Sequence, residues 1–200
     1  MTTPEYNNLL IGMGASAGGL RPIVEIIDLL PSEFQGALLV ASHRDPNAPS
    51  VLGELLQYHT RLRVSEPIDG EALSCTHIYV AGPAEVMTVE GGEVHLGVDR
   101  ERMRAMKRID DLFISIAEAA GQNAVGVILS GMLYDGVKGL QAIKQAGGTC
   151  IVQSPADAEH GDMPRNALEA VAADYVGTTM DIASRLMELA AGRECGEDEE

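Results

Sequence analysis

Short, strongly apolar runs alternate along the chain with longer segments whose apolar residues recur at helical spacing. This alternation predicts β-strands joined by helices and therefore a mostly parallel sheet. We expect strands at residues 9–13, 37–41, 78–81, 124–129 and 149–152, with a short strand at Tyr175. We expect helices at residues 21–30, 49–59, 109–120, 136–146, 164–172 and 181–191. The sequence thus predicts an α/β fold with a doubly wound, Rossmann-like sheet between two layers of helices.

Two further segments alternate with a period of two residues and predict a β-hairpin. Residues 85–89 and 93–97 flank Gly91-Gly92, a pair suited to a tight turn between antiparallel strands. We therefore expect a mixed sheet. The chain has 200 residues, the size of one α/β domain, and we assign residues 1–190 to that domain and residues 191–200 to an acidic, flexible tail.

Composition and charge disfavour several kinds of partner. The formal net charge is −16, which disfavours nucleic acid and anionic membrane surfaces because both attract clustered Lys and Arg. No apolar run reaches the length of a membrane span, and the first residues do not resemble a secretion signal. Three cysteines without C-x-x-C spacing indicate neither a disulfide framework nor a zinc site. Together these features predict a protein of the cytoplasm.

The loops after three of the expected strands carry side chains that can cooperate in catalysis. Ligands bind a doubly wound sheet at the carboxyl ends of its strands, and these loops contain Ser16, His43 and Asp135. A serine hydroxyl becomes a strong nucleophile when an imidazole takes its proton, and the imidazole needs a carboxylate to set its tautomer. We therefore predict Ser16 as nucleophile, His43 as base and Asp135 as the orienting carboxylate, with no metal ion or organic cofactor. Glycines around Ser16 permit a sharp turn whose backbone N–H groups can bind an oxyanion.

Nucleotide binding is an alternative interpretation of the first loop. Residues 12–17 read GMGASA and match the G-x-G-x-x-A pattern between a strand and a helix. A dinucleotide site also calls for an acidic residue at the end of the second strand, where this chain has Ser42 and His43, and Asp45 comes late. The pattern therefore favours a cofactor site less than a serine nucleophile. Structural or exposed positions are expected for the other histidines, His59, His77, His95 and His160.

Five spaced motifs resemble those of one protein family. They read IGMGASAGG at residues 11–19, VASH at 40–43, DDLFISIA at 110–117, VILSGMLYDGVKG at 127–139 and MPR at 163–165. In this order they resemble the catalytic domain of the CheB-type chemotaxis protein-glutamate methylesterases, and the resemblance extends over nearly the whole chain.

The resemblance implies a function and partners. It places Ser16, His43 and Asp135 on the family's triad, and Ala17 and Met132 in the loops that support the oxyanion site. The implied reaction is hydrolysis of glutamate γ-methyl esters on methyl-accepting chemotaxis receptors with release of methanol, often with deamidation of receptor glutamines. The family's receiver domain has no counterpart in these 200 residues, so we expect a standalone catalytic domain and a separate receiver protein as a further partner.

Several positions depart from the family pattern. Ala17 and Ser42 stand where the family has Thr and Gln, and residues 105–108 read AMKR in place of HRPS. Leu133 and Tyr134 add bulk where the family has Gly and a small residue. We expect these loops to line the substrate entrance, which would include Arg44, Leu133, Tyr134 and Arg108, with Arg104 and Lys107 adding positive charge.

Two other functions stay open at this point. The same triad can act on a different ester or amide, because the entrance loops differ from the family pattern. A catalytically weak or inactive binding module in signalling is the second alternative, because the bulk of Leu133 and Tyr134 can disturb Asp135.

Overall fold

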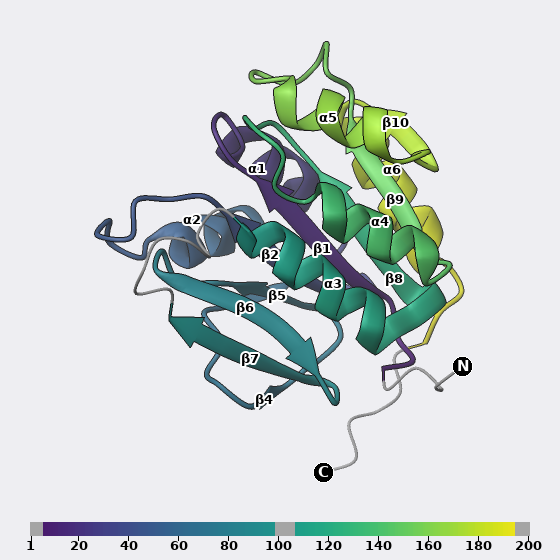
Figure 1. The fold of residues 1–200 in the computed structure, drawn as a ribbon. Helices are drawn as coiled ribbons and strands as arrows, with labels where there is room; N and C mark the ends of the chain where they lie inside the picture. The colour runs from purple at the N-terminus through teal and green to yellow at the C-terminus, as the bar shows by residue number, and fades with distance from the viewer. Residues whose placement is uncertain (1–5, 99–106, 195–200) are drawn as a thin grey trace.

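The computed structural model of the chain describes residues 6–98 and 107–194. Within them, seven parallel strands form the main sheet in the order β10-β9-β8-β1-β2-β5-β3 (Figure 1). From β1 the chain adds strands on one side, and it then returns to add β8, β9 and β10 on the other. This order confirms the predicted doubly wound α/β fold. The strands are β1 (Leu10–Ala15), β2 (Ala37–Ser42), β3 (Arg63–Ser65), β5 (His77–Val80), β8 (Ala124–Ile128), β9 (Thr149–Gln153) and β10 (Tyr175–Gly177).

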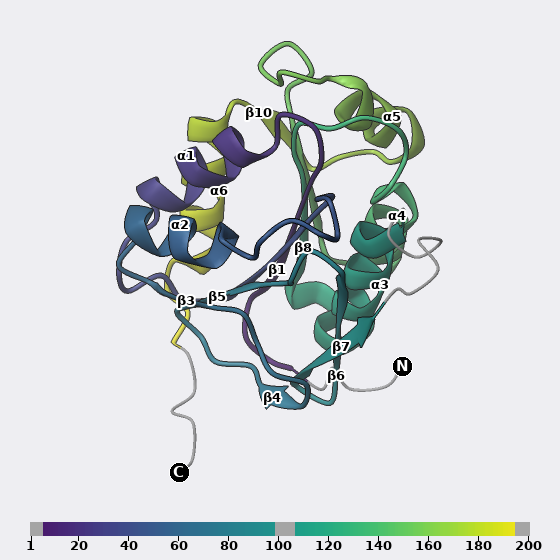
Figure 2. The same cartoon turned by 90° about the vertical axis from the view of Figure 1, so that its left-hand side faces the viewer.

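Helices cover both faces of this sheet and make it the middle of three layers (Figure 2). One face is covered by α1 (Leu20–Leu29), α2 (Leu52–His59) and α6 (Thr179–Ala190). The other face is covered by α3 (Arg108–Ala120), α4 (Val137–Gln145) and α5 (Asp162–Ala170). Each face has its own buried apolar cluster. Because both faces of the strands are buried, the strands are apolar throughout rather than alternating, which is why they are easy to recognise in the sequence.

The hairpin belongs to a second, small sheet, so the expectation of one mixed sheet is wrong. Strands β6 (Glu85–Glu90) and β7 (Glu93–Val98) pair antiparallel, and β4 (Glu71–Ala72) joins β7. The reason is that the buried face of the hairpin packs against α3, where the N–H of Val89 donates a hydrogen bond to Ser115 Oγ at 3.0 Å. Strands β3 and β4 were not expected, because they have three and two residues and contain no apolar run.

Close packing of α3 on β1 explains the glycines of the first strand. A Cβ atom at Gly12 would lie 2.7 Å from ring atoms of Phe113, and one at Gly14 would lie 2.4 Å from Ile109 Cγ2. Both glycines lie inside β1 and face α3, so they let the helix approach the sheet. The G-x-G-x-x-A match therefore has a packing explanation that needs no nucleotide.

The structure also bears on three smaller expectations. Cys150 is free and buried, whereas Cys75 is disulfide-bonded, although the spacing of the cysteines indicates no disulfide framework. Arg104 and residues 195–200 of the predicted tail lie outside the described residues. In the described part of the chain, no helix combines the length and apolar character needed to cross a membrane.

Candidate active site

Ser16 lies directly after β1, at the carboxyl edge of the main sheet and beside the point where the winding direction changes. Its N–H donates to the Ser130 carbonyl at 3.0 Å, and its carbonyl accepts from the N–H of Gly19 at 2.9 Å. Gly18 has a φ of +69°, and a Cβ there would lie 2.9 Å from Ser130 Oγ. This sharp turn into α1 requires glycine at position 18 and holds the Ser16 side chain at the sheet edge.

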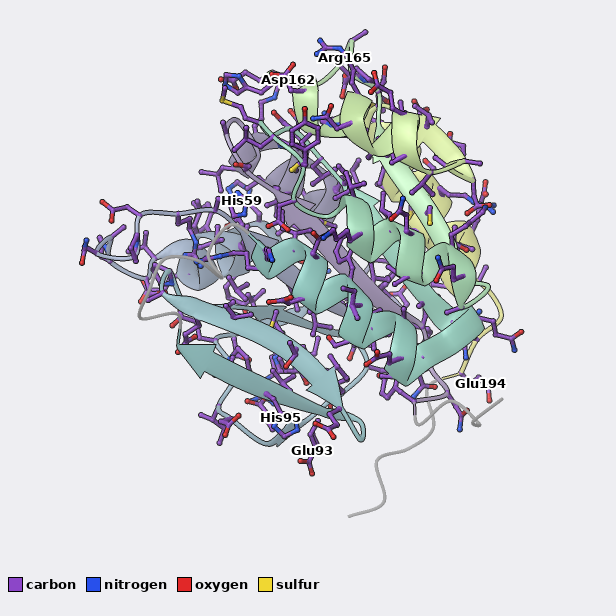
Figure 3. The ribbon with its side chains drawn as sticks, in the orientation of Figure 1. His59, Glu93, His95, Asp162, Arg165 and Glu194 are labelled. Atoms are coloured by element: carbon purple, nitrogen blue, oxygen red, sulfur yellow. The ribbon has the colours of Figure 1, made fainter. Side chains whose placement is uncertain are left out.

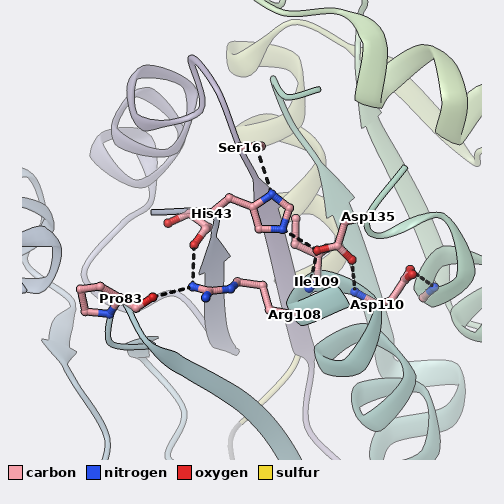
Figure 4. Close-up of polar contacts among 9 residues, drawn as sticks. Ser16, His43, Pro83, Arg108, Ile109, Asp110 and Asp135 are labelled. Carbon is pink, nitrogen blue, oxygen red and sulfur yellow. Dashed lines mark hydrogen bonds and ion pairs between the residues drawn. The ribbon is translucent and has the colours of Figure 1, made fainter. Parts of the chain in front are cut away.

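His43 follows β2, the neighbour of β1, and its ring bridges the other two predicted residues (Figure 4). Its Nδ1 lies 3.1 Å from Ser16 Oγ, and its Nε2 lies 2.7 Å from Asp135 Oδ2. The backbone N–H of His43 donates to the Ala15 carbonyl at 3.2 Å, which ties the two loops together. The parallel pairing of β1 and β2 therefore brings a hydroxyl and an imidazole from separate loops into contact.

Asp135 lies in the loop between β8 and α4, and its side chain is only 2% exposed. Its carboxylate accepts the N–H of Ile109 at 3.1 Å and the N–H of Asp110 at 2.9 Å, both in the first turn of α3. A carboxylate accepts hydrogen bonds and has none to donate, so Asp135 accepts from His43 as it does from the two backbone N–H groups. The proton of the imidazole is thereby assigned to Nε2, which leaves Nδ1 as the acceptor for the Ser16 hydroxyl.

Asp110 is a buried carboxyl group behind Asp135 that sequence reasoning recognised only as part of a motif. Its Oδ1 accepts the N–H of Gly139 in α4 at 2.9 Å. Burial raises the pKa of Asp110; the hydrogen bond from Gly139 lowers it, and the nearby Asp135 raises it further. The backbone of α3 thus binds the Asp135 side chain in the loop before α4, and the backbone of α4 binds the Asp110 side chain of α3. This reciprocal contact fixes the carboxylate that orients His43.

The two residues predicted to support an oxyanion lie in the loops that meet at Ser16. Ala17 follows Ser16 directly, and its carbonyl accepts a hydrogen bond from Ser130 Oγ at 2.9 Å. Met132 lies in the loop after β8 and is 47% exposed. Its neighbour Gly131 packs so closely on the nucleophile that a Cβ there would lie 2.9 Å from Ser16 Cβ. Both loops therefore lie against the Ser16 side chain or next to it in the sequence.

Two hollows flank His43 and contain three of the four residues predicted at the entrance. A cavity of about 450 Å³ contains Ser16 and His43 together with Arg44, whose guanidinium donates to the Ala81 carbonyl. The apolar side chains on its walls and rim include Leu20, Ile23, Val51, Leu52 and Leu55. A second hollow of about 330 Å³ also borders His43 and is lined in part by the exposed side chains of Leu133 and Tyr134.

Arg108 does not line the entrance, and that prediction is wrong. Its residue is only 3% exposed, and Nη1 donates to the carbonyls of Ser42 and Pro83, each at 3.1 Å (Figure 4). Arg108 is the first residue of α3, and its side chain points toward the ends of β2 and β5. Carbonyl groups at the ends of these strands need donors once buried, and the guanidinium supplies them.

The remaining histidines lie on other elements. His59 ends α2 and His95 lies on β7 (Figure 3), while His77 is buried at the start of β5. His160 precedes α5 and lies 3.7 Å from the carboxylate of Glu159. Among the described residues, no group of three or more His, Cys, Asp or Glu side chains is placed to hold a metal ion. The MPR motif opens α5, where Arg165 pairs with Asp162 at 2.6 Å (Figure 3).

A hydroxyl, an imidazole and a carboxylate joined in series at the carboxyl edge of a doubly wound sheet form the arrangement of α/β serine hydrolases. The profile of one such family, described as CheB methylesterase, matches residues 11–186. The chain belongs to the CheB methylesterase family.

Comparison with individual proteins agrees with this membership. A protein-glutamate methylesterase/protein-glutamine glutaminase of Paraburkholderia xenovorans is 34% identical over 194 residues, which cover 92% of this chain and 53% of that protein. A putative protein of the same name from Leptospira interrogans is 31% identical, and the match covers 90% of this chain and 93% of that protein. The crystal structure of the Thermotoga maritima CheB methylesterase catalytic domain superposes with a TM-score of 0.82 at 29% identity, covering 92% of this chain and all of that one. The chain spans about half the length of several of the curated relatives it matches, including the one from Paraburkholderia xenovorans.

Proposed function

We propose that this protein is a serine hydrolase that removes methyl groups from glutamate γ-methyl esters of chemotaxis receptors. The observation that carries the proposal is the continuous set of contacts from Ser16 Oγ to His43 Nδ1 at 3.1 Å and from His43 Nε2 to Asp135 Oδ2 at 2.7 Å. The names of the relatives supply the substrate class. The intact contacts argue against an inactive binding module.

The reaction follows from these three side chains. Ser16 Oγ attacks the ester carbonyl carbon and transfers its proton to His43 Nδ1, while Asp135 stabilises the imidazolium. The tetrahedral intermediate collapses when the bond to the methoxy oxygen breaks, and His43 returns the proton to that oxygen, releasing methanol. Water then attacks the acyl-Ser16 ester with His43 again as base, which regenerates Ser16 and leaves the glutamate carboxylate.

The loops of Ala17 and Met132 are proposed to bind the oxyanion, because Ala17 directly follows Ser16 and Gly131, the neighbour of Met132, lies against the Ser16 side chain. Arg44, Leu133 and Tyr134 are proposed to contact the substrate around the reacting ester. Deamidation of a receptor glutamine uses the same acyl-enzyme and releases ammonia in place of methanol. A chemotaxis receptor and a separate receiver protein are the proposed partners, and the cytoplasm is the proposed location.

Hydrolysis of a different ester is the second candidate, and the cavity beside Ser16 favours it. About 450 Å³ is far more space than a methyl group fills, and the walls are largely apolar. A bulkier alkyl ester would fit this hollow. Rapid hydrolysis of such an ester, together with no methanol release from receptor fragments, would establish this alternative.

Methanol release from methylated chemoreceptor fragments tests the proposal. Wild type should release methanol, and Ser16→Ala should lose the activity by several orders of magnitude, because the nucleophile of a triad cannot be replaced by its partners. Ser184→Ala is the matched control, since it removes an exposed hydroxyl on α6. Equal release by wild type and Ser16→Ala would contradict the proposal. Binding of the fragment without release by wild type would identify a binding module.

A further inference from the structure

Arg108 makes contacts that reach two of the three loops around the site. Its buried Nη1 donates to the carbonyl of Ser42, the last residue of β2, and to the carbonyl of Pro83, in the loop after β5. Ser42 directly precedes His43, so the guanidinium holds the main chain one residue away from the imidazole. Arg44, one residue on the other side of His43, donates to the carbonyl of Ala81 in that same loop. Two arginines thereby bind the chain on both sides of His43 to the end of β5.

The backbone next to Arg108 holds the other partner of the imidazole. The N–H groups of Ile109 and Asp110, the next two residues of α3, bind the carboxylate of Asp135. The first turn of α3 therefore makes two kinds of contact (Figure 4). The Arg108 side chain binds the main chain next to His43, and the backbone N–H groups of Ile109 and Asp110 bind the side chain of Asp135. These two sets of contacts are made to the chain beside His43 and to Asp135, the residues whose Nε2 and Oδ2 atoms lie 2.7 Å apart.

We infer that Arg108 is a positioning residue of this site: by holding the Ser42 carbonyl, it sets where the His43 imidazole lies between Ser16 and Asp135. This inference rests on the proposed function only in requiring that Ser16 be activated by His43. The acceptor in residue 42 is its main-chain carbonyl, so the contact depends on the side chain of Arg108 and not on that of Ser42. A displacement of a catalytic group by about 1 Å can lower a rate about 100-fold, so a side chain that touches no substrate can control activity.

Labelling of Ser16 by a fluorophosphonate tests the inference without any receptor substrate. Ser16 Oγ attacks phosphorus, fluoride leaves, and His43 takes the hydroxyl proton, so the labelling rate reports how well His43 is placed. Arg108→Met keeps much of the side-chain volume and removes the donors, and it should label about 10- to 100-fold more slowly than wild type. Arg108→Lys keeps the charge and a donor near the two carbonyls and should recover most of the rate. In methanol release, Arg108→Met should lower kcat and leave KM nearly unchanged.

A control variant on the same helix distinguishes a loss of protein stability from a displacement of His43. Ser115 is buried in α3 and bonds to Val89 N–H, away from His43. Ser115→Ala should lower the midpoint of thermal unfolding but label at the wild-type rate. The downfield ¹H NMR resonance of His43 Nε2–H should shift or broaden in Arg108→Met and stay in place in Ser115→Ala.

The outcomes separate this inference from the proposed function. The positioning role would be overturned if Arg108→Met were labelled at the wild-type rate. It would also be overturned if the labelling rates of Arg108→Met and Ser115→Ala fell in proportion to the decrease in their midpoints of thermal unfolding. Wild-type protein that resists labelling would overturn it as well, since His43 would then activate no nucleophile. A third outcome is that wild type is labelled rapidly but releases no methanol, while Arg108→Met is labelled slowly. This result would contradict the methyl ester substrate and support the positioning role of Arg108.

Discussion

At the scale of single residues, His77 illustrates how burial makes a side chain sensitive to pH. His77 is 2% exposed, its ring stacks on Tyr79 with centroids 4.0 Å apart, and its Nε2 lies 2.8 Å from Ser65 Oγ. Burial lowers the pKa of His77 from 6.5 to about 4; the positive charge of Arg63 lowers it further, and Glu71 opposes the change. His77 is therefore neutral in the folded protein at pH 7, as most buried histidines must be.

This lowered pKa predicts a loss of stability in acid. Between pH 6.5 and about 4 the unfolded chain binds a proton that folded His77 does not, so the free energy of unfolding falls as pH falls through this window. The full contribution is present above pH 6.5, and at most about 3 kcal/mol is lost by pH 4. Urea denaturation should show that wild type loses more stability than His77→Gln between these pH values. A difference between the two proteins that does not change with pH would contradict this account.

At the scale of secondary-structure elements, the contact of α3 with β1 sets the position of the candidate site. Phe113 of α3 lies against the glycine at position 12 of β1, and the first turn of α3 binds Asp135. The fit is close because a Cβ at Gly12 would lie 2.7 Å from the Phe113 ring and 2.9 Å from Ile116 Cδ1. Any side chain at position 12 would therefore push the helix away from the sheet.

Gly12→Ala should destabilise the protein by about 1–3 kcal/mol, because an inserted methyl group overpacks this contact. Replacing Phe113 by Leu at the same time should recover part of the loss, so the double variant should be more stable than the sum of the single changes predicts. Chemical denaturation of the three variants measures this coupling. Gly97→Ala in β7 is the control, since its Cβ would meet only the Val86 carbonyl at 3.8 Å. Additive effects of Gly12→Ala and Phe113→Leu would show that the two residues do not share this contact.

At the scale of the whole molecule, the net charge of −16 should govern the encounter with an acidic substrate. Like charges slow association, and salt screens them over a Debye length of about 10 Å at 0.1 M. If the substrate is an acidic receptor helix, kcat/KM for a methylated fragment should rise with added NaCl, while the rate for a small neutral ester should stay constant. Initial rates of methanol release measure both. A rate that falls with salt would instead show that basic residues near the site, such as Arg44 and Lys107, attract the substrate.

Much of the fold was predictable because its main strands are buried on both faces. Continuous apolar runs identified β1, β2, β5, β8 and β9, and their order along the chain implied a doubly wound sheet. The short strands β3 and β4 were missed because they contain little apolar sequence. The hairpin was recognised from its alternation, but its partner could not be, since alternation shows which face of a strand is buried and not which element covers that face.

The sequence by itself determined the kinds of element, their order and the three loops that contain Ser16, His43 and Asp135, since periodicity and loop position are local properties of the chain. Only the tertiary structure decided which atoms meet: that Nδ1 of His43 contacts Ser16 and Nε2 contacts Asp135, and that Asp135 is held by the first turn of α3. It also decided that Arg108 is buried rather than at the entrance. The reason is that the sequence shows a charge but not its surroundings, and a guanidinium can be buried once neighbouring strand ends present carbonyl groups to it.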